Sequence, residues 1–145
     1  GAERIVRTDT APLRDSLKAA VPEGGDVVFD PVGGAFFDAT LSTLRYGGRL
    51  VSLGFASGER PIAPVNRVLA RHLSIVGSSL GLTCHKNSAK VDEMFDTLGL
   101  WLAQDRIRPK ADVVLPFDAL PDALKMLADR AVTGRVVLYE DPKGN

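Results

Sequence analysis

Two stretches of the chain end an apolar run abruptly in glycine and other small residues. The first is DVVFDPVGG, residues 26–34, and the second is RLVSLGFASG, residues 49–58. Glycine has no side chain, so it lets the backbone turn sharply and lets a ligand approach the main chain closely. In an open α/β sheet, ligands bind beyond the carboxyl ends of the strands. We therefore expect the two stretches to share one edge where the backbone approaches something closely.

Most other residues that could do chemistry have a simpler structural explanation. Asp30 follows a strand and precedes a proline, so we expect a turn former or a helix N-cap rather than an acid or base. Cys84 and His85 could suggest a metal or nucleophile pair, but adjacent residues cannot easily face one metal and no third ligand is near. We expect a loop or core role for both. Arg67 and Arg71 are expected to solvate a helix face, with a phosphate contact as the alternative.

The composition is that of an ordinary globular domain with its own core. The chain has 145 residues, of which 45% are hydrophobic and 25% are charged, and its formal net charge is zero. Nucleic acids and acidic membrane surfaces attract a basic excess, which is absent here. No apolar run approaches the roughly 20 residues of a membrane span. A single cysteine cannot form an internal disulfide, so a reducing compartment, the cytoplasm, is predicted.

Short β-branched runs alternate with helical patterns along the chain. We expect strands at residues 4–7, 27–29, 49–53, 73–76, 113–115 and 136–139. Helices are expected at residues 13–21, 36–44 and 66–72, from Ser88 onward, and around 120–127. The alternation predicts an α/β fold: a partial Rossmann-like, mostly parallel sheet with flanking helices. About four strands have parallel-type connections, while the last two can belong elsewhere.

Three finer expectations concern single elements. The strand at 27–29 shows no polar alternation, so both of its faces are predicted to be covered. Ser88 is a plausible N-cap of the best helix, and Asp118 is a possible cap of the helix around 120–127. The best helix has one apolar stripe that is predicted to be buried, formed by Val91, Met94, Phe95, Leu98 and Leu102.

Four segments in order resemble one enzyme family. They are DVVFDPVGG with the following FFDATLSTLRYGGRLVSLGFASG, then NRVLARHLSIVGSSLG, and finally LPFDALPDALKMLADRAVTGRVVL. Together they resemble the medium-chain dehydrogenase/reductase superfamily, in its NADPH:quinone oxidoreductase branch, over about residues 1–138. The resemblance implies that residues 1–109 are the C-terminal half of a Rossmann cofactor domain. It also implies that residues 110–145 return toward a GroES-like catalytic domain.

The resemblance also implies which residues lie near a nicotinamide cofactor. The turn with Val32 and Gly33 is similar to one near the nicotinamide ribose. Gly54, Phe55 and Ala56 match a turn against the nicotinamide ring. The same comparison places Ser78, Ser79 and Leu80 beside that ring and Arg135 near the cofactor phosphates. Turn formation alone is the alternative explanation of Gly33 and Gly34, and it is the favoured one for Gly47 and Gly48.

No Gly-rich phosphate loop occurs in the sequence, and such enzymes are about twice as long, so the chain is expected to be a fragment. The intact parent would use NADP and transfer hydride to a quinone or enone. NADP would bind the isolated chain weakly or not at all, and the isolated chain would have no activity. No catalytic residue and no metal site is assigned. The alternatives are a non-catalytic dimerisation module and an unrelated small, flavodoxin-like α/β binding domain.

One strand carries a partner prediction. LSIVGSS, residues 73–79, is short, apolar and near the end of the strand order, and exposed apolar edges attract pairing. In the family that this chain resembles, the matching strand pairs with its twin across a two-fold axis. A homodimer through Leu73–Ser79 is therefore predicted, with a self-complementary contact.

Overall fold

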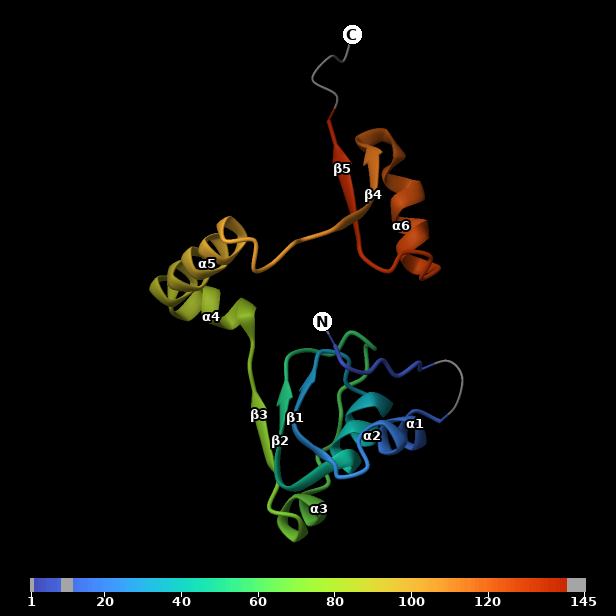
Figure 1. Cartoon of the computed structure of the whole chain (residues 1–145), viewed down its shortest axis with the longest axis vertical. Coiled ribbons are helices and arrows are strands. Elements are labelled where there is room, and N and C mark those ends of the chain that lie inside the picture. Colours follow the sequence, from blue (N-terminus) through green and yellow to red (C-terminus); the bar gives the residue numbers. More distant parts are fainter. Residues whose placement is uncertain (1, 9–11, 141–145) are drawn as a thin grey trace. The chain divides into compact units, whose positions relative to one another are not determined.

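The computed structural model describes residues 2–8 and 12–140 (Figure 1). The chain divides between Lys90 and Val91 into two compact units, and each is described here by itself. Both units contain parallel strands with helices between them. This confirms the predicted α/β class with mostly parallel pairing.

The first unit is built on a three-stranded parallel sheet. Its strands are β1 (Gly25–Asp30), β2 (Leu44–Ser52) and β3 (Ser74–Gly77), in the order β1-β2-β3. The register aligns Phe29 with Val51 and Val51 with Val76. Strands that are consecutive in sequence are therefore neighbours in space, and β3 lies at one edge of the sheet, as predicted for this strand.

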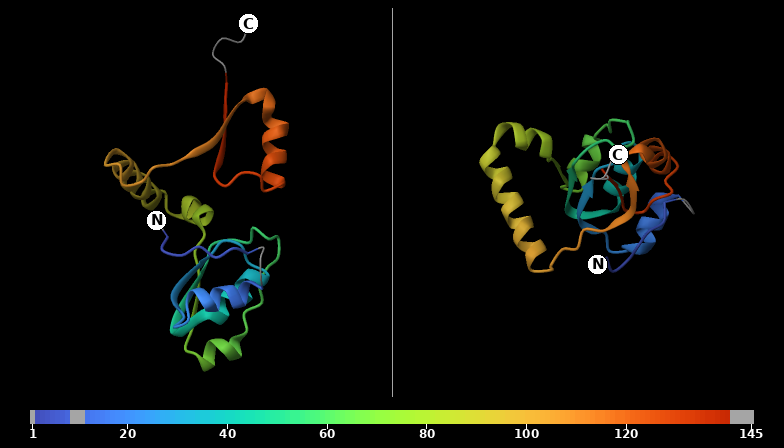
Figure 2. Two further views of the ribbon diagram at one scale, coloured as in Figure 1. Left: turned by 45° about the vertical axis from the view of Figure 1, so that its right-hand side comes forward. Right: turned by 90° about the horizontal axis from the view of Figure 1, so that it is seen from above.

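The core of the first unit lies between this sheet and one helix. The helix α2 (Ala35–Thr43) packs on β1 and β2, and α1 (Leu13–Ala20) packs against α2 on the same side of the sheet (Figure 2). The core cluster of fully or nearly buried side chains is Phe37, Leu41, Leu44, Leu50 and Leu73. Burying a leucine or phenylalanine contributes roughly 1.5–3 kcal/mol each, so this cluster stabilises the unit.

The opposite face of the sheet is open, which corrects one expectation. Val27 is 48% exposed and Phe29 is 68% exposed, whereas Val28 between them packs against the core. The prediction that both faces of this strand are covered is therefore wrong within the described residues. A run of apolar residues shows that a strand suits a covered sheet, but the covering helix must come from another segment.

Most predicted elements of the first unit are present, with two differences. Residues 4–7 form no strand: Ile5 is 87% exposed, and a strand needs a partner for its backbone groups. A short helix that was not predicted, α4 (Leu80–Lys86), follows β3. Its first turn is capped by the Ser79 Oγ atom, which accepts a hydrogen bond from the Leu82 N–H at 3.2 Å. The predicted helix at 66–72 is α3 (Val65–Ala70).

The second unit contains a smaller parallel pair. The strands β4 (Ala111–Pro116) and β5 (Arg135–Tyr139) pair with each other in a separate sheet. Between them lie a short 3-10 helix, η1 (Phe117–Ala119), and α6 (Leu120–Ala128). The last two strands thus do belong to another sheet.

Helix caps differ from the two that were predicted. The best helix is α5 (Ser88–Ala103), and its cap is Asn87, whose Oδ1 atom accepts from the Lys90 N–H at 3.0 Å. Ser88 is the first helical residue instead. Asp118 lies inside η1, and the residue that caps α6, Ala119, makes no side-chain capping bond. The cap of α5 lies one residue before the predicted one, and a short 3-10 helix precedes α6. Helix propensity does not define helix boundaries this finely.

The predicted burial of the α5 stripe is also wrong within the described residues. Met94, Phe95, Leu98 and Leu102 are between 39% and 64% exposed. Helical spacing shows that these side chains share one face, but it does not supply the surface that would cover them.

Candidate functional site

The candidate site is the edge of the first sheet where its strands end. The Leu53 N–H donates to the Asp30 carbonyl at 2.8 Å, and the Ser78 N–H donates to the Ser52 carbonyl at 2.9 Å. Each bond joins the residue that follows one strand to the last residue of the neighbouring strand. The three loops that leave β1, β2 and β3 therefore start side by side. This edge is the place where open α/β sheets bind ligands.

The first loop is a tight turn held by Asp30. This residue is only 2% exposed, and its Oδ1 atom accepts from the Val32 N–H at 2.8 Å and the Gly33 N–H at 3.0 Å. The arrangement is an Asx-type turn, in which a side-chain oxygen replaces a backbone acceptor. The expected role of Asp30 as a turn former is what the structure shows. Its second oxygen, Oδ2, is buried without a hydrogen-bond partner among the described residues.

The second loop, residues 53–59, is bonded directly to the first. The Ala56 N–H donates to the Pro31 carbonyl at 3.0 Å. Ser57 donates twice to the Val32 carbonyl, from its N–H at 3.0 Å and from its hydroxyl at 2.8 Å. The two glycine-containing strand ends therefore form one continuous surface, and Ser57 is a residue that the sequence pattern did not single out.

The close contact between the loops requires glycine at position 33, and the positive φ favours glycine at both positions of this turn. Gly33 has φ +73°, and a Cβ atom there would lie 2.9 Å from the Glu59 carbonyl oxygen and 3.0 Å from the Phe55 ring. Gly34 has φ +54°, and a Cβ atom there would lie 2.9 Å from the Glu59 Oε2 atom. The space that a side chain would fill is taken by the second loop. A cofactor contact at Gly33 stays a prediction beside this structural explanation.

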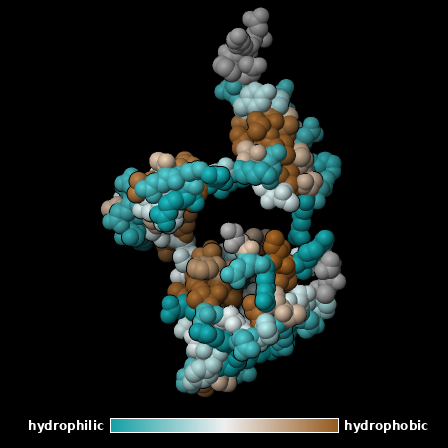
Figure 3. Space-filling model, in the orientation of Figure 1, coloured by the Kyte–Doolittle hydropathy of each residue, from teal (hydrophilic) through white to brown (hydrophobic). Residues whose placement is uncertain are grey.

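Several of the predicted cofactor residues are exposed along the same edge. Phe55 is 47% exposed and Leu80 is 58% exposed, and Figure 3 shows an apolar surface over the ends of β1 and β2. Ala56, Ser78 and Ser79 are exposed as well, whereas Gly33 is buried and Val32 and Gly54 are partly buried. These groups offer apolar contact, hydroxyls and backbone but no acid or base. A role of these residues in holding a nicotinamide ring stays a prediction.

One predicted cofactor residue belongs to the second unit. Arg135 is the first residue of β5 in the second unit. Its proposed approach to the cofactor phosphates stays a prediction.

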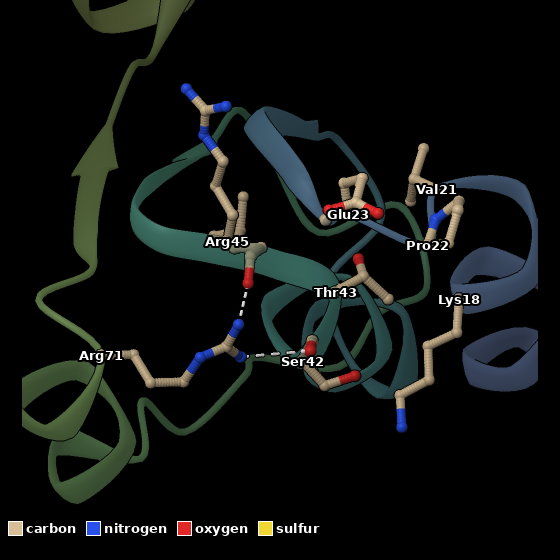
Figure 4. A pocket seen from close by; sticks show the side chains of 10 residues that line it. Lys18, Val21, Pro22, Glu23, Ser42, Thr43, Arg45 and Arg71 are labelled. Carbon is tan, nitrogen blue, oxygen red and sulfur yellow. Dashed lines mark hydrogen bonds between the residues drawn. The ribbon is translucent and has the colours of Figure 1, made fainter.

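The pocket drawn in Figure 4 lies at the opposite ends of the strands. It is lined by residues that precede or begin β1 and β2, among them Gly24, Leu44 and Arg45. Arg71 crosses it and donates to the carbonyls of Ser42, at 3.2 Å, and Leu44. Arg71 therefore satisfies carbonyl groups at the end of α2, instead of only solvating its own helix face as predicted. A cation that is already bonded in this way does not indicate an anion site.

Metal and membrane signals are absent from the described part of the chain. In residues 2–8 and 12–140, no group of three or more His, Cys, Asp or Glu side chains could hold a metal ion. Cys84 is exposed on α4, beside His85. Within the same residues, no helix combines the length and the apolar character that crossing a membrane requires.

Comparisons with known proteins agree with this geometry. A family described as zinc-binding dehydrogenase matches residues 1–138. Quinone oxidoreductase-like protein 2 of Mus musculus is 32% identical over 139 residues, which cover 95% of this chain and 40% of that protein. Prostaglandin reductase-3 of Mus musculus is 45% identical over 105 residues, which cover 66% of this chain and 28% of that protein. The chain thus spans less than half the length of these relatives.

The solved structures show the same fold. The crystal structure of CurA from Vibrio vulnificus in complex with NADPH superimposes with a TM-score of 0.75 at 22% identity, covering 96% of this chain and 43% of that one. The flavodoxin-like alternative is excluded by the family match, and the resemblance drawn from the motifs is confirmed. The chain belongs to the zinc-binding dehydrogenase family, within the medium-chain dehydrogenase/reductase superfamily.

Proposed function

We propose that the first unit forms the nicotinamide side of a cofactor site in an oxidoreductase that transfers hydride to a quinone or enone. The observation that carries the proposal is the meeting of three strand-end loops at one edge, with exposed apolar side chains and hydroxyls. The mouse relatives, named as quinone oxidoreductase-like and as a prostaglandin reductase, support the class of substrate. NADP is the proposed cofactor, supported by the NADPH complex of CurA.

The residues present fit the flat end of such a cofactor. We assign Phe55 and Ala56 to one side of the nicotinamide ring and Ser78–Leu80 to its flank. The turn at Val32 and Gly33 would then lie by the nicotinamide ribose. Its backbone is held by hydrogen bonds, so it would form a preorganised contact surface there. The cofactor, when bound, supplies the hydride, and the protein holds it against the acceptor and excludes water.

Because the chain covers 40% of its mouse relative, the isolated chain would hold only part of such a site. Residues 1–109 would supply half of the cofactor domain, and residues 110–145 would return toward a catalytic domain. We expect weak NADPH binding and no turnover without the remaining contacts, because each missing contact lowers affinity.

An NMR titration of the 145-residue chain with NADPH tests the assignment. Chemical-shift changes should be largest at Val32, Gly54–Ala56 and Ser78–Leu80. The dissociation constant should lie in the millimolar range, which corresponds to a binding free energy of about −4 kcal/mol. Ala56→Glu should abolish them, because the new carboxylate adds bulk and negative charge at this edge. Ala70→Glu is the matched control, since Ala70 is exposed on α3, next to the start of β3.

One outcome would contradict the assignment, and another would contradict the expectation of weak binding. Shift changes confined to the pocket of Figure 4 would place the ligand at the wrong end of the strands. Submicromolar affinity would show that the chain already holds a complete site.

The sheet edge supports a second proposal, a homodimer through Leu73–Ser79. Among the strands that the structure describes, β3 pairs with β2 and with no other. The Ser78 N–H points toward β2, so in an alternating strand the Gly77 N–H points to the free edge. Gly77→Pro would remove that donor, and edge positions tolerate proline. Sedimentation equilibrium should show a dimer that this substitution weakens, and a monomer at every accessible concentration would refute the proposal.

A further inference from the structure

The Val32 peptide groups are held from two sides by residues that belong to different strand ends. Its N–H donates to Asp30 Oδ1 at 2.8 Å. Its carbonyl accepts both the Ser57 N–H at 3.0 Å and the Ser57 hydroxyl at 2.8 Å. A carbonyl oxygen has two lone pairs, so Ser57 uses the full acceptor capacity of this group. Asp30 and Ser57 are therefore linked through one residue, although no hydrogen bond joins them directly.

The hydrogen bonds that Asp30 accepts are stronger than those of an ordinary turn. Asp30 is 2% exposed, and a buried carboxylate forms stronger hydrogen bonds to backbone N–H groups than a neutral acceptor does. The Ser57 hydroxyl also accepts from the Glu59 N–H at 3.2 Å, which folds its own loop back toward the turn. The Glu59 carbonyl then occupies the space beside Gly33. Each loop thus supplies part of the shape that the other requires.

We propose that Asp30 and Ser57 are positioning residues that join the turn 31–34 and the loop 53–59 into one rigid platform. The inference rests on the proposed function, because the platform would hold the residues that contact the nicotinamide ribose and those that contact the nicotinamide ring at a fixed spacing. Neither side chain is assigned to the cofactor itself. Rigidity of this kind raises affinity because less conformational freedom is lost on binding.

A merely local role predicts a different response to substitution. If Asp30 shaped only its own turn, its loss would affect the Val32 and Gly33 amides, which are its direct partners. A joined platform responds across the loops, so that losing Asp30 also loosens the Ala56 and Ser57 amides. Conversely, losing the Ser57 hydroxyl would loosen the Val32 and Gly33 amides.

Amide hydrogen exchange followed by NMR on the 145-residue chain separates these cases. In Asp30→Ala, the exchange rates of the Ala56 and Ser57 amides should rise about 5- to 30-fold, the factor for 1–2 kcal/mol of lost stability. Asp30→Asn should raise these rates less than Asp30→Ala does, because it keeps an oxygen acceptor but loses the negative charge that strengthens the two bonds. Ser57→Ala should speed exchange at Val32 and Gly33, and Ser74→Ala, at an exposed serine of β3, is the control.

The outcomes are decisive in both directions. If Asp30→Ala speeds only the Val32 and Gly33 amides, or Ser57→Ala leaves those two amides unchanged, the platform does not exist. If Asp30→Ala also exposes the Leu50 amide in β2, the unit has opened globally. The decision then rests on Ser57→Ala, whose side chain is exposed, and on Asp30→Asn. The exchange rates need no cofactor, so a failed NADPH titration would overturn the proposed function and leave this inference standing.

Discussion

Gly33→Ala tests how closely the two strand-end loops pack. Gly33 has φ +73°, and its added methyl would lie 2.9 Å from the Glu59 carbonyl oxygen, a backbone atom that cannot rotate aside. Gly47 is the matched control, with φ +76° and no atom within 4 Å of the added methyl. Both substitutions force an alanine into the left-handed region, at about 1–2 kcal/mol each. Only Gly33→Ala adds overpacking, which costs about 1–3 kcal/mol.

The expected difference between the two variants is therefore about 1–3 kcal/mol in the free energy of unfolding of the first unit. Exchange of the Leu50 and Val51 amides, in the central strand, follows global opening of the first unit. Equal destabilisation by the two alanines would show that the loops do not pack as closely as described.

Three further tests concern single elements. Leu50→Ala, at a side chain with 0% exposure, should lower the free energy of unfolding by about 2–5 kcal/mol, whereas Leu69→Ala, at 78% exposure, should change it by less than about 0.5 kcal/mol in chemical denaturation. Arg71→Ala should destabilise the first unit by about 1–3 kcal/mol, because carbonyls at the end of α2 lose their donor; unchanged amide exchange there would contradict this role. Asn87→Ala should lower the stability of α5 by about 0.5–2 kcal/mol, while Ser88→Ala should have a smaller effect, as measured by circular dichroism, and the reverse order would restore Ser88 as the cap.

The sequence predicted the order and type of elements better than it predicted their environment. Apolar runs and helical spacing are local properties, so the strands of both sheets and the helices at 13–21, 36–44 and 120–127 could be placed from them. Coverage is not local. Phe29 is exposed although residues 27–29 are uniformly apolar, and Phe95 is exposed although it belongs to a regular helical stripe. In both cases the sequence pattern identifies a face that favours burial, but it does not identify the segment that would pack on that face.

The candidate site shows the same division. Asp30, Gly33 and Gly34 stand out because acid, proline and glycine at a strand end indicate a turn. Ser57 does not stand out, because one serine in a polar loop carries no periodic signal. Its role depends on where the loop after β2 lies relative to the turn after β1, which only the sheet register fixes. Arg71 is expected from the sequence to solvate its helix face, and the pattern gives no sign of its carbonyl acceptors, which are 27 and 29 residues away.

The sequential strand order of the first sheet bears on how the chain acquires its structure. Because β1, β2 and β3 adjoin in the order in which they are synthesised, each new strand meets a finished neighbour as it leaves the ribosome. Among the described strands of this sheet, no later strand has to be inserted between two earlier ones. Each parallel crossover therefore joins neighbouring strands directly, which keeps the entropy cost of loop closure low.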